Sequence, residues 1–346
     1  MLHRCSIKGV ALLVLCAGIA FPFRASASSA QDVSAPPGAH RLFFPNTGRG
    51  GGVDCVAQYP VALNGYANQT SSNSTTEIIS IVQQSGGNLV PYFPYLPLPS
   101  ANTAFLNQFQ STGVRLIANL ESVTEKMFDA TTEAQLVAWV NAVKNHPSFW
   151  GYFLYDEPEI RQNFSSVNAA KIQRIHTLIK QNDPVHPTLL NFSSPTTAYI
   201  PYLGIANIAS FDYYPVHGSG SYRTSMTEYQ QVVDKFVADH AQYDPTGKTE
   251  VLGTYVQSFR NDALAIREIT QEEMQQMVDY ARSKSTKFNF VSYFLIRWGG
   301  QETSYPGLQQ LPSLRTKAAG VNVSIRNLPS PYPVYTNSPC VVAPQW

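Results

Sequence analysis

The chain has 346 residues, and its 24 basic and 23 acidic side chains give a formal net charge of +1 at pH 7. Charged residues make up 14% of the chain and aromatic residues 12%. This balance gives no electrostatic footprint for nucleic acid or an anionic membrane, so we expect neither as a partner.

The first 27 residues have the pattern of a signal peptide. Arg4 and Lys8 form a short basic region, and Val10 to Phe21 is apolar but too short to span a bilayer as a helix. Ala25-Ser26-Ala27 fits a cleavage site. We therefore expect a secreted or periplasmic protein. Cleavage removes three basic residues and no acidic one, which leaves a net charge of about −2.

Two cysteines remain after the signal peptide is removed. Cys5 and Cys16 leave with it, whereas Cys55 and Cys340 stay near opposite ends of the mature chain. In an oxidising compartment such a pair is expected to form a disulfide. The alternative is two unpaired thiols.

The rest of the chain divides by composition. Residues 28–50 are rich in Ser, Pro and Gly and predict an irregular lead-in. Short apolar runs after this lead-in predict strands at Val53–Val61, Asn88–Phe93, Val114–Leu120, Phe149–Tyr155, Thr188–Phe192, Ile205–Phe211, Glu250–Val256 and Phe288–Ile296. Amphipathic runs between them predict helices at Thr75–Ser85, Asn102–Thr112, Thr132–Lys144, Ser166–Asn182, Ser225–Gln242 and Thr270–Lys284.

Eight strands mostly separated by helices predict a single-domain (β/α)8 barrel, the TIM-barrel fold. We place the barrel at residues 51–318 and a C-terminal tail at 319–346, so that irregular extensions flank it on both sides. A doubly wound sheet is the alternative, but no glycine-rich phosphate turn follows the first strand.

The fourth predicted strand is the most informative segment. The apolar run from Phe149 ends abruptly in Asp156, Glu157 and Pro158. Two adjacent carboxylates repel, and in a partly dry site one of them tends to be held protonated, as a general acid requires. The alternative is that one of the acids merely caps a helix beginning near Glu159.

Other predicted strands also end in polar side chains, at the face where active sites of this fold are built. They are Asn119 to Glu121 after strand three, Asn191 after strand five, Asp212 to Pro215 after strand six, Tyr255 to Gln257 after strand seven, and Arg297, Trp298, Gln301 and Glu302 after strand eight. Together they could bind a polyol and transfer a proton.

The segment from Trp150 to Pro158, the run from Phe211 to Pro215 and the Arg297-Trp298 pair resemble the barrel glycoside hydrolases, near the clan whose acid/base Glu ends strand four. The resemblance covers roughly residues 53–305. It implies that Glu157 protonates the glycosidic oxygen and that Asp156 orients the substrate or tunes the acid. It also implies that Trp298 forms the floor under the sugar, and that Tyr213 or Tyr214 hydrogen-bonds the sugar or the second catalytic group.

The chain departs from that clan at two positions. Gln257 stands where the clan has a Glu nucleophile, and Asp156 stands where the clan usually has Asn. The second carboxyl group is then Asp212, Glu121 or Glu302, acting as a base in an inverting reaction or as a nucleophile in a retaining one. Asp156 could instead steer a 2-acetamido group of the substrate. We favour Asp212, because it ends a strand before a rigid Tyr-Tyr-Pro turn.

The sequence thus predicts a secreted, monomeric glycosidase without cofactor or metal, acting on a carbohydrate. Its histidines show no metal-binding spacing, and no Gly-x-Ser-x-Gly elbow follows a strand. A non-catalytic carbohydrate-binding barrel, favoured by Gln257, and a polysaccharide lyase are the alternatives. The predicted substrate contacts are Glu121, Asn191, Tyr213, Tyr214, Gln257, Arg297 and Trp298.

Overall fold

The computed structural model describes residues 57–64, 75–91, 99–125, 130–161, 167–193, 197–216, 225–260, 266–294 and 306–335. All of them belong to one compact unit within residues 51–346. Cys55, His217, Arg297, Trp298, Gln301, Glu302, Cys340 and the predicted signal peptide therefore lie outside the described residues.

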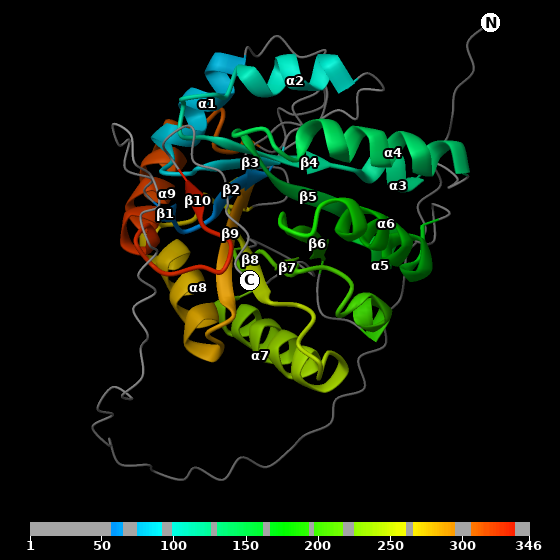
Figure 1. Cartoon of the computed structure of the whole chain (residues 1–346). Helices are drawn as coiled ribbons and strands as arrows, with labels where there is room; N and C mark the ends of the chain where they lie inside the picture. Colours follow the sequence, from blue (N-terminus) through cyan, green and yellow to red (C-terminus); the bar gives the residue numbers. More distant parts are fainter. Residues whose placement is uncertain are drawn as a thin grey trace, which may run out of the picture. The chain divides into compact units, whose positions relative to one another are not determined.

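Eight parallel strands close into a barrel, as Figure 1 shows. In barrel order they are β2 (Val61–Asn64), β3 (Leu89–Pro91), β4 (Arg115–Asn119), β5 (Phe149–Asp156), β6 (Thr188–Phe192), β7 (Ile208–Asp212), β8 (Val251–Val256) and β9 (Phe288–Phe294), with β9 pairing back to β2. Helices are interleaved with the strands. The predicted (β/α)8 barrel is confirmed.

Seven helices of nine residues or more are described. They are α1 (Thr75–Gln84), α2 (Pro99–Asn107), α4 (Ala130–Val143), α6 (Ala169–Asn182), α7 (Met226–Tyr243), α8 (Gln271–Lys284) and α9 (Pro312–Ile325). Shorter helical segments are α3 (Glu121–Glu125), α5 (Pro158–Arg161) and the 3-10 helix η1 (Thr197–Tyr202). In its described part, the connection from β6 to β7 contains only η1.

The barrel interior is packed with apolar side chains. Each strand contributes to one buried cluster, in which Trp150 stacks on Phe290 with ring centroids 6.2 Å apart. A separate antiparallel pair, β1 (Ala57–Gln58) with β10 (Val334–Tyr335), adds Val334 to this cluster. Because β1 precedes the first barrel strand, this pair lies at the N-terminal ends of the strands. The catalytic face of the fold is the opposite end.

Two predicted boundaries were wrong. The first predicted strand, Val53–Val61, ends where barrel strand β2 begins, because Pro60 has no N–H for a ladder and separates β2 from β1. Helix α9 was not predicted, and it continues past residue 318, the last residue of the predicted barrel.

Gly151 allows close packing beside the fourth barrel strand. A Cβ atom there would lie 2.7 Å from the carbonyl oxygen of Pro187. Since the neighbour is backbone, it cannot easily move away. The glycine in the Trp-Gly-Tyr segment is therefore required by packing against the start of β6.

Candidate active site

The carboxyl ends of β4 to β7 bring together four of the predicted site residues. Strand register places Asp156 opposite Asn191, and Asn191 opposite Ser210. Glu121 begins the short helix directly after β4, and Asp212 ends β7.

Hydrogen bonds fix the orientation of Asp156. The Asn191 amide donates to Asp156 Oδ1 at 2.9 Å and accepts from the Ser210 hydroxyl, also at 2.9 Å. Asn191 has 0% exposure. Its predicted role as a sugar contact therefore does not fit the structure, because the buried amide is used to hold Asp156.

Glu121 supports the same residue from the other side. Its Oε1 accepts from the backbone N–H of Asp156 at 3.1 Å, and its Oε2 accepts from the Asn119 amide at 3.3 Å. With 8% exposure, Glu121 is a buried support for the end of β5. This placement favours a positioning role over the catalytic and sugar-binding roles considered from the sequence.

Glu157 lies in a strained turn between strand and helix. Its φ of 48° is in the left-handed region, which residues with a side chain seldom adopt. The turn is held by hydrogen bonds from Glu157 N to Asn191 O at 2.8 Å and from Ile160 N to Glu157 O at 3.1 Å. The alternative interpretation of this segment was right in one respect, since a one-turn helix, α5, does begin at Pro158. Strain of this kind costs about 1–3 kcal/mol and is concentrated at functional sites.

The Asp212 carboxyl interacts electrostatically with Asp156 and Glu157 at the end of β5. Burial and the negative charges of Glu157 and Asp156 raise the pKa of the Asp212 carboxyl well above its ordinary value of 3.8. The residue is partly exposed, yet its Oδ1 is buried without a hydrogen-bond partner among the described residues. Both effects favour the protonated form of Asp212.

One of the two predicted tyrosines contacts the Asp212 carboxyl. The Tyr214 hydroxyl donates to Asp212 Oδ2 at 3.2 Å, and its ring packs edge-on against Phe259, with centroids 4.8 Å apart. Burial and the nearby Asp212 raise the pKa of Tyr214, so the hydroxyl remains a donor. Tyr213 is half-buried and packs against the outer core.

Gln257 is used entirely for structure. Its Oε1 accepts from Val216 N at 2.9 Å and its Nε2 donates to Val216 O at 3.2 Å, and the residue has 0% exposure. The predicted contact with a substrate would require both of these hydrogen bonds to be given up. The side chain that stands in place of a nucleophile fastens the loop after β7 to the end of β8.

Glu159 lies near Asp156 and Asp212 but was not predicted as a site residue. This residue is 3% exposed, and its Oε1 accepts from Ser193 N at 2.7 Å and Ser193 Oγ at 3.0 Å. Burial raises the pKa of Glu159, and the charge of Asp156 adds to the effect. Its position two residues after Glu157 in the Asp-Glu-Pro-Glu segment was the available signal.

Two broader searches concern only the described part of the chain. It contains no group of three or more His, Cys, Asp and Glu side chains suited to a metal ion. Within the same residues, no helix is both long and apolar enough to cross a membrane.

No protein-family model matches the chain, and no curated protein is similar to it in sequence. Solved structures do match its fold. A GH5_18 protein from Bifidobacterium longum subsp. infantis superposes with a TM-score of 0.53 at 10% identity, covering 80% of this chain and 81% of its own. A β-galactosidase from the psychrophilic Marinomonas ef1 gives a TM-score of 0.53 at 11% identity, covering 77% of this chain and 59% of its own.

A third match is a GH2 β-galacturonidase from Eisenbergiella tayi bound to galacturonate. Its TM-score is 0.50 at 13% identity, covering 78% of this chain and 52% of its own. The present chain thus spans little more than half the length of the latter two proteins. At these identities the likeness shows a shared barrel fold.

Proposed function

We propose that this protein is a monomeric glycoside hydrolase that cleaves O-glycosidic bonds of an oligo- or polysaccharide at the carboxyl ends of β5 and β7. The supporting observation is that Asp156, Glu157 and Asp212 interact there while burial favours the protonated form of one of them. Hydrolysis of this kind uses one protonated and one ionised carboxyl group. The names β-galactosidase and β-galacturonidase among the similar barrels agree with a glycosidic substrate.

In the proposed reaction Glu157 donates its proton to the glycosidic oxygen, and Asp212 provides the second carboxyl group. Asp212 would attack the anomeric carbon if the carboxyl groups stand about 5–5.5 Å apart, or activate water at about 6.5–9.5 Å. Asp156 orients the substrate, because Asn191 and Glu121 hold it in place. Substrate-assisted hydrolysis would instead use Asp156 to steer a 2-acetamido group.

One observation favours a second division of roles. Because burial and neighbouring charge raise the pKa of Asp212, a proton shared by the pair would reside on Asp212 in the free protein. Asp212 would then be the proton donor and Glu157 the ionised partner. The overall reaction is the same, but the two assignments predict different variant kinetics.

The test begins with a panel of aryl glycosides and polysaccharides, to find a substrate that the wild-type protein hydrolyses. Glu157→Gln should then lower kcat/KM by about 10²–10⁴-fold on a substrate with a poor leaving group, and far less on one with a good leaving group, which needs little protonation. Asp212→Asn should reduce activity on both substrates. The reverse pattern would exchange the two roles.

Glu272→Gln, an exposed residue of α8, provides a matched control that should keep full activity. Unchanged turnover of Glu157→Gln across the panel would contradict the enzyme proposal. Binding without turnover by the wild type would support a non-catalytic barrel. An unsaturated product detected by ultraviolet absorbance would indicate a lyase.

We also propose export with removal of residues 1–27, and a disulfide between Cys55 and Cys340. The β1–β10 ladder supports the disulfide, since it pairs Ala57 with Tyr335, close in sequence to the two cysteines. Mass spectrometry of the secreted protein should find an N-terminus at residue 28. Thiol titration after denaturation should find no free thiol, and two free thiols would contradict the pairing.

A further inference from the structure

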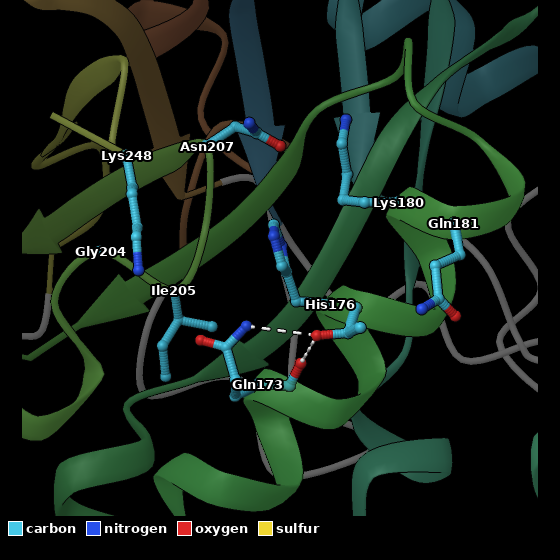
Figure 2. A pocket seen from close by; sticks show the side chains of 9 residues that line it. Gln173, His176, Lys180, Gln181, Gly204, Ile205, Asn207 and Lys248 are labelled. Carbon is cyan, nitrogen blue, oxygen red and sulfur yellow. Dashed lines mark hydrogen bonds between the residues drawn. The ribbon is translucent and has the colours of Figure 1, made fainter. Parts of the chain in front are cut away.

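A pocket of about 500 Å³ lies away from the carboxyl ends of the strands. Its walls are the C-terminal half of α6, the turn before β7 and the loop before β8, so it opens at the N-terminal ends of the strands. Figure 2 shows the residues that line it: Gln173, His176, Thr177, Lys180, Gln181, Gly204, Ile205, Asn207 and Lys248.

The pocket occurs where the barrel has an unusual connection. The described part of the β6–β7 connection forms η1 rather than a longer helix, which leaves space beside α6. Gly204 makes the turn there with a φ of +73°, and a Cβ atom on it would lie 3.1 Å from Asp244 Oδ1. Asp244 also accepts from Lys248 N at 3.0 Å and Thr249 N at 2.8 Å. The Asp244 carboxylate thus lies beside the turn before β7 and accepts hydrogen bonds from the loop before β8, which are two of the three walls.

Hydrogen-bond donors remain available in the pocket. Lys180 Nζ donates to Pro184 O at 2.7 Å and His186 O at 3.0 Å, which holds the ammonium and leaves one of its three N–H groups. The Asn207 amide oxygen accepts from Thr188 N at 3.1 Å and Thr188 Oγ1 at 3.2 Å. This arrangement fixes the amide and leaves its NH₂ group for a ligand.

Lys248 differs from most of the other lysines in the described part of the chain. Its ammonium makes no hydrogen bond or ion pair there, whereas the ammonium groups of Lys144, Lys180, Lys235, Lys284, Lys287 and Lys317 all do. In Figure 2 His176 lies between Lys180 and Lys248. Two cationic side chains thus border the same pocket.

The lining contains basic residues and no acidic one. Burial and the charges of Lys180 and Lys248 lower the pKa of His176 to about 4, as expected where positive charge accumulates. The carboxylates near the pocket already accept hydrogen bonds from other residues. Asp183 accepts from Tyr152 and lies against His186, Asp244 accepts from two backbone N–H groups, and Glu250 accepts from Tyr332.

We propose that this pocket binds an oxyanion of the phosphate or sulfate class, either free or as an ester group on a glycan. Lys248 and Lys180 supply charge, and the amide of Asn207 supplies a neutral donor. Ammonium and amide N–H groups are donors from which the oxygens of phosphate and sulfate accept hydrogen bonds. The site is independent of the proposed glycosidase activity, which depends on other residues at the opposite end of the barrel.

The test is a titration of the whole protein with sodium sulfate, sodium phosphate and a sulfated oligosaccharide at constant ionic strength. The His176 ring resonances should shift and saturate, with His146, outside the pocket, as the internal reference. Lys248→Gln should weaken binding about tenfold, the usual effect of one charge-assisted hydrogen bond. Tighter binding of the oligosaccharide than of inorganic sulfate would identify the ester as the ligand.

Lys284→Gln is the matched control, because it removes the same charge from α8, outside the pocket. It should bind like the wild type. Equal weakening by the two substitutions would show only a general charge effect and would overturn the proposal. The absence of any saturable shift at His176 with all three ligands would also overturn it.

Discussion

At the scale of single residues, Asp212 has the most unusual environment in the candidate active site. In the unfolded chain its carboxyl group ionises near its ordinary pKa of 3.8, whereas burial and the charges of Glu157 and Asp156 raise that pKa in the folded protein. The folded state therefore favours the protonated form. Its contribution to stability is fully present below pH 3.8 and is lost as the pH rises through the folded-state pKa.

Asp212→Asn keeps the shape and removes this titration. We expect the variant to gain stability relative to the wild type as the pH rises above about 4. Urea denaturation at a series of pH values between 4 and 8 measures the difference in unfolding free energy. A difference that stays constant over this range would show that Asp212 titrates normally.

Asn191 offers a second test at this scale. Asn191→Ala removes the donor to Asp156 and the acceptor for Ser210. We expect a loss of about 1–3 kcal/mol in the free energy of unfolding, because buried polar groups lose their partners. Activity should also fall, with kcat affected more than KM, because Asp156 is no longer oriented.

Ser210→Ala is the comparison, since it removes the hydrogen bonds to Asn191 and Leu190 O but leaves the Asn191–Asp156 hydrogen bond in place. It should retain most activity while losing some stability. Equal losses of activity in the two variants would contradict a specific role for the Asn191–Asp156 contact.

The sequence identified the acidic pair but not its arrangement. An apolar run ending in Asp156 and Glu157 predicts where a strand stops. The left-handed turn at Glu157 depends on hydrogen bonds to Asn191 and Ile160, which a pattern of residue types does not contain. Asn191 and Gln257 were expected to face a sugar because they lie near strand ends. Both side chains are buried instead, Asn191 bonded to Asp156 and Gln257 bonded to Val216.

At the scale of elements, Gln257 joins β8 to the loop after β7. Gln257→Glu would place a carboxylate where the resembled clan has its nucleophile. We expect no gain in activity and a loss of about 3 kcal/mol or more, because the new charge would be buried against Val216 O. Chemical denaturation and the glycoside assay measure the two effects.

Gln257→Met separates lost hydrogen bonds from added charge. It should be destabilised less than Gln257→Glu at neutral pH. A stable and more active Gln257→Glu variant would show that this position faces the substrate after all.

A buried network joins β5 to the connection between α6 and β6. Asp183 Oδ2 accepts from the Tyr152 hydroxyl at 2.7 Å and lies 2.7 Å from His186 Nδ1. Burial opposes ionisation of Asp183, but the hydrogen bonds and charge of His186 and the Tyr152 hydroxyl outweigh it and lower the pKa to about 2. The ionised carboxylate therefore stabilises the fold.

This contribution of about 2 kcal/mol is present above pH 3.8 and is lost as the pH falls towards 2. Asp183→Asn should be less stable than the wild type at pH 7, and the difference should shrink below pH 4. Asp279→Asn, on the exposed face of α8, is the control and should change little. A difference independent of pH would contradict the assigned ionisation.

Long apolar runs made most strands predictable. The predicted strands from Asn88–Phe93 to Phe288–Ile296 overlap β3 to β9 in order. Shorter elements were missed, because one-turn helices such as α3 and α5 have too few residues to show a period. Helix α9 has a weak signal, with Gly320 in its interior and no side-chain cap at Leu311.

At the scale of the whole barrel, the two ends of the strands carry different candidate sites. Carboxyl groups gather at the C-terminal ends, and Lys180 and Lys248 border the pocket at the N-terminal ends. The pattern of strands predicted the barrel and the site at the C-terminal ends of the strands. The pocket at the N-terminal ends borders the connection between β6 and β7, which has no periodic sequence pattern. This pocket could therefore be found only in the structure.

Closure of the barrel joins segments that are far apart in the chain. The Tyr59 hydroxyl donates to Phe288 O across 229 positions, and β2 pairs with β9 beside it. A chain ending at Lys284 lacks β9, and we expect it to show no cooperative unfolding transition by circular dichroism. A sharp transition in that fragment would show that the elements up to α8 fold without closure.

The β2–β9 pairing also sets the order of events during synthesis. A ribosome has to complete almost the entire chain before β2 meets its second neighbour, and until then β2 remains an open sheet edge. Closure of the barrel must therefore wait until β9 has been synthesised. Until β9 emerges, the nascent chain therefore presents β2 as an unpaired strand edge, the kind of edge at which chains associate with one another.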